Sequence, residues 1–177
     1  MQQQHLALSV IAPEKTDLLK QIAEICAQYQ CQITEARFSA NGQNHIIMMY
    51  IAGSWNAIAK VESPLLALAS QENVFLKLTR TEMQAAQPTL LPYIVHITSV
   101  SAPQTLDQLL AFFTSNQIKL NDLAVTQYLA NRTQAKMQTI VMTVLIPVET
   151  HLADLRESFI IFCDEYNLDA IFEPDRL

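Results

Sequence analysis

The stretch that decides the fold is residues 6–29, which read LALSVIAPEKTDLLKQIAEICAQY. The alternating run Leu6–Ile11 predicts a strand, and the polar residues 12–17 predict a turn in which Thr16 or Asp17 can cap a following helix. Apolar side chains then recur at steps of three and four residues, which predicts a helix with one buried face. The residues of that face are Leu18, Leu19, Ile22, Ile25, Cys26 and Tyr29.

The same block of strand, turn and helix returns about ninety residues later. Tyr93–Val100 predicts a strand and residues 101–104 a turn, and the next helix again shows a single apolar face. That face consists of Leu106, Leu109, Leu110 and Phe113. The recurrence predicts a duplicated chain with two small domains, because a length of 177 residues allows either one medium domain or two small ones.

Each half continues with two strands, a second helix and a last strand. In the first half, Asn41-Gly42 predicts a hairpin turn, and this centre would place Arg37 opposite Ile46 and Glu35 opposite Met48. Pro64 is expected to interrupt or kink the second helix.

The resulting order, βαββαβ, is that of a ferredoxin-like unit, in which two helices cover one face of a four-stranded antiparallel sheet. The predicted fold is therefore α+β, with two tandem ferredoxin-like domains. The first domain is expected over residues 1–81, a linker over 82–91 and the second domain over 92–177.

Two strands are apolar at successive positions, Ile46–Ile51 in the first half and Ile140–Leu145 in the second. This pattern predicts interior strands with apolar side chains on both faces. Because helices cover only one face, we expect parts of the open sheet faces to meet another protein surface. A homodimer is one such arrangement.

Composition excludes several classes of function. The eleven Lys and Arg are scattered and are outnumbered by seventeen Asp and Glu, so the formal charge is −6 and no patch for binding nucleic acid directly is predicted. With only two glycines, the chain cannot contain a Walker loop or a GxGxxG turn. The short, polar start resembles no secretory signal and no run is long enough to span a membrane, so we expect a cytoplasmic protein without a membrane partner.

No reaction centre is predicted either. The four histidines are isolated, no HExxH or zinc-type spacing occurs, and we expect no metal, no cofactor and no enzymatic activity. Cys26 and Cys163 lie on apolar helical faces and are expected to be buried thiols. Trp55 and Phe75 are expected to pack in the core, because no basic groove surrounds them for stacking on a base.

The run Gly53-Ser54-Trp55-Asn56-Ala57-Ile58, followed by Val61-Glu62-Ser63, resembles the glycine cleavage system transcriptional repressor family. The order of elements resembles the tandem ACT domains of that family. The resemblance implies a regulator without its own DNA-reading domain, which contacts a DNA-bound transcriptional activator protein and responds to glycine or another small amino acid.

The resemblance also implies where a small amino acid binds, which is the turn between the first strand and the first helix. A helix start offers unpaired N–H groups to a carboxylate, while acidic groups or carbonyls accept the ammonium. The candidate ligand-binding residues are Ala12, Pro13, Glu14, Lys15, Thr16, Asp17 and Leu18, with Glu35 and Arg37 as neighbours on the next strand, and Asn121 and Asp122 beside the second turn, Ala102 to Leu106. Where such repressors typically read Asp-Arg-Pro-Gly, this chain has Glu14-Lys15-Thr16-Asp17, so a charged side chain replaces a glycine.

Two further functions remain open at this point. The chain could be a structural or adapter protein that needs no ligand and supplies only an interaction surface. It could also bind DNA directly, in which case its affinity would depend steeply on salt.

Overall fold

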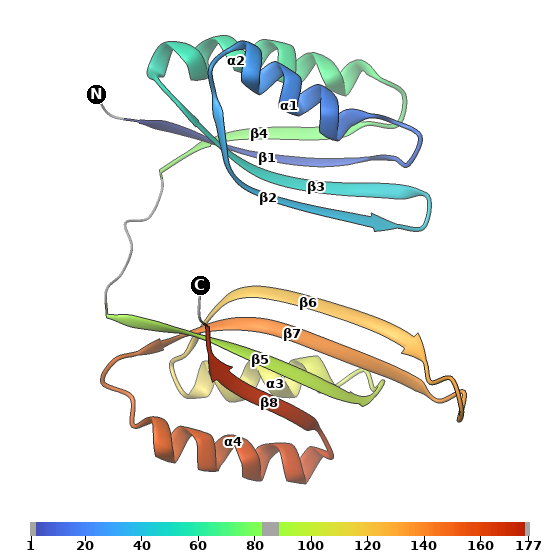
Figure 1. Cartoon of the computed structure of the whole chain (residues 1–177), viewed down its shortest axis with the longest axis vertical. Helices are drawn as coiled ribbons and strands as arrows, with labels where there is room; N and C mark the ends of the chain where they lie inside the picture. Colours follow the sequence, from blue (N-terminus) through green and yellow to red (C-terminus); the bar gives the residue numbers. More distant parts are fainter. Residues whose placement is uncertain (1–2, 83–88, 176–177) are drawn as a thin grey trace. The chain divides into compact units, whose positions relative to one another are not determined.

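The computed structural model describes residues 3–82 and 89–175, and the chain divides into two compact units, Met1–Ala85 and Ala86–Leu177. Each unit is a four-stranded antiparallel sheet with two helices on one face (Figure 1). The predicted α+β fold class is confirmed.

The first domain has the order strand, helix, strand, strand, helix, strand. Its elements are β1 (Gln4–Pro13), α1 (Leu18–Gln28), β2 (Gln32–Asn41), β3 (Asn44–Gly53), α2 (Trp55–Ala67), the 3-10 turn η1 (Leu68–Ser70) and β4 (Phe75–Thr81). The strand order across the sheet is β2-β3-β1-β4, so β3 is an interior strand.

The second domain repeats this plan. Its elements are β5 (Leu90–Val100), α3 (Thr105–Ser115), β6 (Lys119–Leu129), β7 (Lys136–Pro147), α4 (Leu152–Tyr166) and β8 (Asp169–Pro174). The strand order β6-β7-β5-β8 matches that of the first sheet. Strand β5 already begins at Leu90, within the predicted linker 82–91, and residues 83–88 of that linker lie outside the described residues.

Irregular details repeat along with the regular elements. Gln30 and Gln117, 87 positions apart, both follow a helix and both have a positive φ, 55° and 58°. The ladder between β2 and β3 shifts register after Ile33, and the ladder between β6 and β7 shifts after Leu120, again 87 positions later. Matching bulges are a stronger sign of duplication than matching strands, because a bulge is a specific local feature of one backbone.

Each domain has a core of its own between the sheet and its helices. In the first, alternate β1 residues Leu6, Leu8 and Val10 are buried and pack with side chains such as Ile22 of α1 and Ile58 of α2. The second core is richer in aromatic rings, and its cluster includes Tyr93, Phe112, Phe113, Phe159, Phe162 and Phe172. The period of two along the strands decides which side chains enter each core.

The hairpin between β2 and β3 differs from the expected register by two residues. Its two-residue turn is Gly42-Gln43, so Arg37 pairs with Met48 and Glu35 with Tyr50. Gly42 has a φ of 63°, a left-handed conformation that glycine adopts without strain. The glycine therefore takes the first central position of the turn, and Asn41 becomes the last strand residue.

The start of α2 explains the sequence motif around Gly53. Ser54 is the N-cap, and its hydroxyl accepts a hydrogen bond of 3.2 Å from the N–H of Ala57. A Cβ at Gly53 would lie 3.2 Å from the Cys31 sulfur and 3.3 Å from the Ala57 Cβ, so a larger residue there would require these neighbours to shift by a few tenths of an ångström. Pro64 does not interrupt α2, which runs on to Ala67. The proline is tolerated because the carbonyl that loses its partner belongs to Lys60, on the exposed side.

The expectation that Trp55 and Phe75 pack in the core is wrong. Their side chains are 62% and 70% exposed. Trp55 is the first residue of α2, and Phe75 pairs with Ile11 on the sheet face that no helix of the domain covers. Both side chains therefore contribute to the exposed apolar surface of the domain and not to its core.

An ion pair ties β4 to α2 in the first domain. Nε and a terminal nitrogen of Arg80 donate to the two carboxylate oxygens of Glu62 at 2.7 and 2.9 Å. These hydrogen bonds hold the pKa of the Glu62 carboxyl below its ordinary value of 4.5.

We expect Glu62→Gln to lower the Tm of the first domain by a few degrees at pH 7, because the bidentate pair is partly exposed and screened by solvent. A lowered folded-state pKa means that the stabilisation is present above about pH 4.5 and is lost as the pH falls through the folded value. The Tm difference between the wild type and the variant, measured by circular dichroism from pH 7 to pH 3, should therefore shrink below that point. The control is Glu24→Gln, which removes only an exposed 3.8 Å contact with Lys20; a pH-independent difference for Glu62→Gln would contradict the assignment.

Candidate functional site

The turn between β1 and α1 is held by hydrogen bonds to two backbone carbonyls, one of them in the β2–β3 turn. The Glu14 N–H donates to the Gln43 carbonyl at 2.9 Å, and the Thr16 N–H and hydroxyl both donate to the Pro13 carbonyl, at 3.0 and 2.7 Å. Ala12 and Leu18 at the two ends are buried, whereas Glu14, Lys15 and Asp17 are exposed. The turn therefore presents charged side chains from a fixed backbone.

The start of α1 carries no side-chain cap. Asp17 occupies the N-cap position, but its carboxylate makes no capping hydrogen bond, and the Thr16 hydroxyl is committed to Pro13. The expected capping by Thr16 or Asp17 is thus wrong. The first N–H groups of α1 are not occupied by these side chains, which leaves them available to an anionic group.

Glu35 and Arg37 are not brought to this turn. They form an ion pair of 3.2 Å on β2, opposite Tyr50 and Met48 of β3. Because residues that pair across a ladder share a face, both side chains lie on the sheet face opposite to the helices. Strand β3 separates them from β1, and they lie level with Ala7 and Ser9, well before the turn.

A hollow of about 360 Å³ lies at the equivalent turn of the second domain, between β5 and α3. It is bounded on one side by this turn and the start of α3, and on the other by the residues that lead into β8. Its lining residues are Ser99, Val100, Ala102, Gln104, Thr105, Gln108, Tyr166, Asn167 and Leu168. The start of α3 likewise has no side-chain cap, since Gln104 makes no capping hydrogen bond.

Beside this hollow, the core contains a buried polar pair. The Gln138 amide donates to the Ser99 hydroxyl at 3.1 Å, and both residues are buried. The Gln127 amide makes a similar bond of 3.0 Å to Ser101. The sequence analysis missed these residues, although Ser99 gives a signal: it breaks the apolar series Tyr93, Val95, Ile97 at a core position.

Asn121 and Asp122 are not brought to the second turn. Asn121 sits at the register shift of β6, and Asp122 pairs with Thr143, which in turn pairs with Ile94 of β5. The turn lies at the other end of β5, beyond Val100. Asn121 and Asp122 are instead the equivalents of Thr34 and Glu35 in the first domain, 87 positions earlier.

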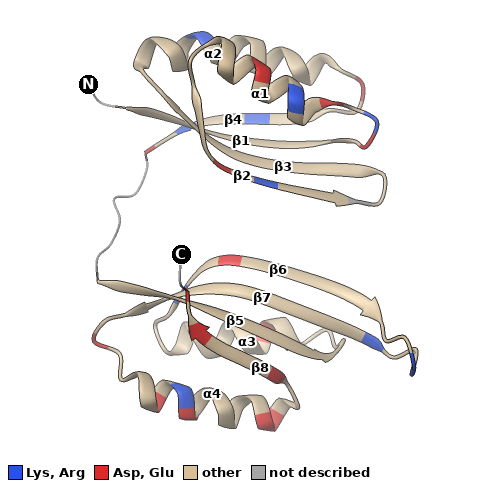
Figure 2. Ribbon diagram, in the orientation of Figure 1, with Lys and Arg blue, Asp and Glu red and all other residues tan. Residues whose placement is uncertain are grey.

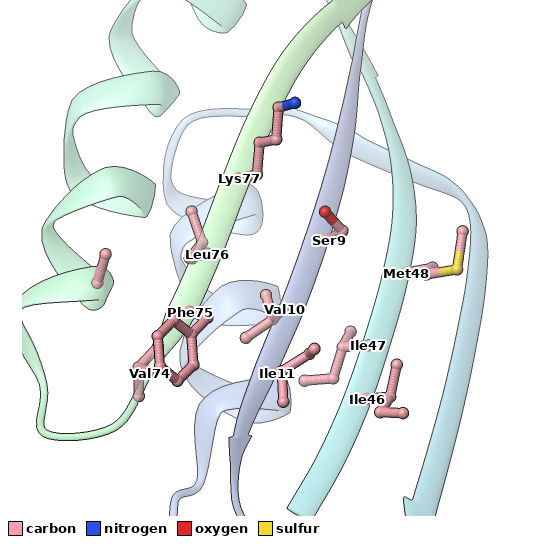
Figure 3. A pocket seen from close by; sticks show the side chains of 11 residues that line it. Ser9, Val10, Ile11, Ile46, Ile47, Met48, Val74, Phe75, Leu76 and Lys77 are labelled. Atoms are coloured by element: carbon pink, nitrogen blue, oxygen red, sulfur yellow. The ribbon is translucent and has the colours of Figure 1, made fainter.

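The face of the first sheet that its helices do not cover is hollowed at one end. Figure 3 shows Phe75 of β4, Ile11 of β1 and Ile46 of β3 across three neighbouring strands, with Lys77, Ser9 and Met48 in the next row. The hollow has a volume of about 490 Å³. A concave apolar surface of this kind is typical of a contact surface.

The cysteines of the described residues are not activated thiols. The three cysteines are buried as free thiols, and burial raises the pKa of Cys26 and of Cys163 to about 11, so both stay protonated at neutral pH. No group of three or more His, Cys, Asp or Glu within residues 3–82 and 89–175 is placed to hold a metal ion. Nor does any helix in these ranges have the length and apolar character that crossing a membrane requires.

A family model of the ACT domain matches residues 4–79. The first domain therefore matches the ACT domain over nearly its whole length. The second domain shares its strand order and its irregular details, so the fold of the chain is that of tandem ACT-type domains.

Comparisons over the whole chain find similar proteins of one named type. The glycine cleavage system transcriptional repressors of Escherichia coli (strain K12) and Shigella flexneri are each 21% identical over 165 residues, which is 93% of this chain and 87% of theirs. A crystal structure described as a candidate glycine cleavage system transcriptional repressor covers the full chain with a TM-score of 0.71 at 19% identity. One of an unknown protein from Galdieria sulphuraria covers 98% of it with a TM-score of 0.75 at 11% identity. The predicted resemblance to the repressor family is confirmed, and it supports a regulatory role.

The two helix starts of the first domain make a testable contrast. Ser54→Ala removes an observed capping bond and should destabilise the first domain by about 1 kcal/mol. Asp17→Ala removes no capping bond and should change the free energy of unfolding by less than half as much. Urea unfolding of both variants would check this; equal losses would show that the Asp17 carboxylate caps α1 in solution.

Proposed function

We propose that the chain is a transcription-regulating protein of the glycine cleavage repressor type, which acts by contacting a DNA-bound activator and responds to glycine or another small amino acid. The observation that carries the proposal is the extent of exposed apolar surface on the two domains. Such surface is costly in water unless a partner covers it at least part of the time.

Protein contact is supported by the outer surface of α2. Trp55 and Leu66 of α2 are exposed in the helix layer of the first domain. Exposed tryptophan is characteristic of residues that anchor protein interfaces, because it buries a large area at small entropic cost. The net charge of −6 fits a protein that works through the activator and does not itself bind DNA.

Response to an amino acid is supported by the two uncapped helix starts. A ligand carboxylate would accept hydrogen bonds from the first N–H groups of α1 or α3. At the first turn, the carboxylate of Glu14 or Asp17 would accept hydrogen bonds from the ligand's ammonium group. Lys15 would add a positive charge near the ligand's carboxylate. At the second turn, the amides of Gln104, Gln108 and Asn167 offer neutral donors and acceptors around a formed hollow.

Calorimetric titration of the full chain with glycine tests ligand binding, with serine and alanine as the other small amino acids. We expect saturable heat with the wild type. Glu14→Gln combined with Asp17→Asn should abolish it if the first turn binds, whereas Thr105→Val combined with Gln108→Leu should abolish it if the second turn binds. Saturable heat that survives both double variants would contradict a site at either turn.

The alternative, a ligand-independent adapter built on the same domains, predicts a different result. It requires that no small amino acid gives saturable heat at millimolar concentration, while partner binding is intact. That outcome would remove amino-acid sensing from the proposal but leave the regulatory contact.

Contact with the activator is tested by copurification from the native host followed by a gel-shift assay. We expect the chain alone not to shift promoter DNA even at low salt, and to alter the mobility of the complex formed by the activator. Trp55→Ala should weaken that effect about tenfold or more, as expected for an interface anchor. A shift by the chain alone that weakens steeply with salt would instead indicate direct DNA binding.

A further inference from the structure

Both sheets have an open face, which is the face that points away from the helices of the same domain. On the first open face the exposed large side chains are Ile11, Ile46, Met48, Tyr50 and Phe75. On the second open face they are Val100, Tyr128 and Ile171. Ile94 and Val141 of this face are half-buried, and His96 and four threonines (98, 126, 139 and 143) lie in the same rows. The first open face therefore has an apolar centre formed by three neighbouring strands, whereas the second has apolar side chains on four strands with threonines and His96 among them.

The two open faces have opposite charge. The first carries Lys77 on β4 and the pair of Arg37 and Glu35 on β2, a net charge of +1. The second carries Asp169 and Glu173 on β8, and Asp122 and Lys119 on β6, a net charge of −2. Figure 2 shows the contrast between the equivalent edge strands: β4 is coloured only by basic residues and β8 only by acidic ones.

Three of these charges have no ionic partner among the residues that the structure describes. Lys77, Asp169 and Glu173 are exposed and form no ion pair there. If two first open faces met, Lys77 and Arg37 would meet their own copies, and two second open faces would bring acidic groups together. Contact between unlike faces is the arrangement that pairs these charges.

The area of the faces decides how many such contacts are needed. Four strands spaced about 4.8 Å apart and about seven residues long make a face on the order of 450 Å². One contact between faces of two separate chains buries roughly 900 Å², which is below the size of a stable interface between chains, whereas two contacts bury about 1,800 Å², which falls within the standard range.

We propose that the open faces are covered by a second copy of this chain, in a reciprocal dimer. The first open face of each protomer packs on the second open face of its partner, with Phe75, Ile11 and Ile46 against the apolar side chains of the opposite sheet and Lys77 beside the acids of β8. A two-fold axis relates the two contacts, so the assembly closes at two chains.

This inference goes beyond the proposed function, because it concerns the sheet layer alone. The helix layer, with Trp55 and Leu66, remains exposed in such a dimer and is left for the activator. A failure to dimerise would therefore leave amino-acid binding and activator contact intact. A failure of either of these functions would leave the dimer intact.

Sedimentation velocity of the full chain, from about 1 to about 100 µM, tests the proposal. The wild type should sediment as a dimer that dissociates on dilution. Lys77→Glu alone, or Asp169→Lys with Glu173→Lys, should raise the dimer Kd about tenfold or more, because either change makes the opposed faces alike in charge. All three changes in one chain exchange the signs of the faces and should restore dimerisation.

A matched pair of aromatic variants separates the sheet layer from the helix layer. Phe75→Ala should weaken the dimer about tenfold, whereas Trp55→Ala, which removes a side chain of similar exposure from α2, should leave its Kd within about twofold. A wild type that is monomeric over the whole range, a triple variant no stronger than the single charge reversals, or equal effects of the two aromatic variants would each overturn the proposal. Circular dichroism spectra that match the wild type show that the variants are folded.

Discussion

One-sided packing is the constraint on which the rest of this structure depends. Each sheet buries one face under two helices, and the alternation of side chains along a strand leaves every second residue on the other face. In β3 the inward residues Ile47, Met49 and Ile51 form the core, and their neighbours Ile46, Met48 and Tyr50 remain in water. The second set adds nothing to the domain core, so its apolar character requires a reason outside the isolated domain.

The same plan decides where a small ligand can be held. In both domains the first strand ends beside the start of the first helix, and neither helix start is capped by a side chain. The two turns nevertheless differ. The first presents the charged side chains of Glu14, Lys15 and Asp17 from a rigid backbone, whereas the second has a formed hollow lined by neutral polar groups. Duplication has produced two turns of one geometry with different chemistry.

Much of the fold could be predicted from sequence because its signals are local. Periodicities of two and of three to four, repeated after about ninety residues, were sufficient for both domains. The register of the β2–β3 hairpin could not be predicted, because Gly42 suits either the first or the second central position of a two-residue turn. The observed pairing of β2 with β3 makes Gly42-Gln43 the turn. The exposure of Trp55 and Phe75 could not be predicted either, because the hydrophobicity of a residue does not determine which face of a helix or sheet it occupies. The neighbours of each turn could not be predicted either, because they depend on the register between strands. The observed registers place Glu35, Arg37, Asn121 and Asp122 away from the turns.

The hairpins at the far ends of the two sheets show how the copies have been free to diverge. In the first hairpin, Asn41 pairs with Asn44 and the two enclose two residues. In the second hairpin, the equivalent pair, Tyr128 and Met137, encloses eight residues. Strands β6 and β7 nevertheless keep the pairing pattern of β2 and β3, including the bulge. The extra residues lie in the loop beyond the paired strands, so they leave the register unchanged and move no side chain from one face of the sheet to the other. The tip of the β6–β7 hairpin is therefore a natural place to insert an epitope or a fluorescent label, because an added segment would extend into solvent from a site that has already accepted six residues.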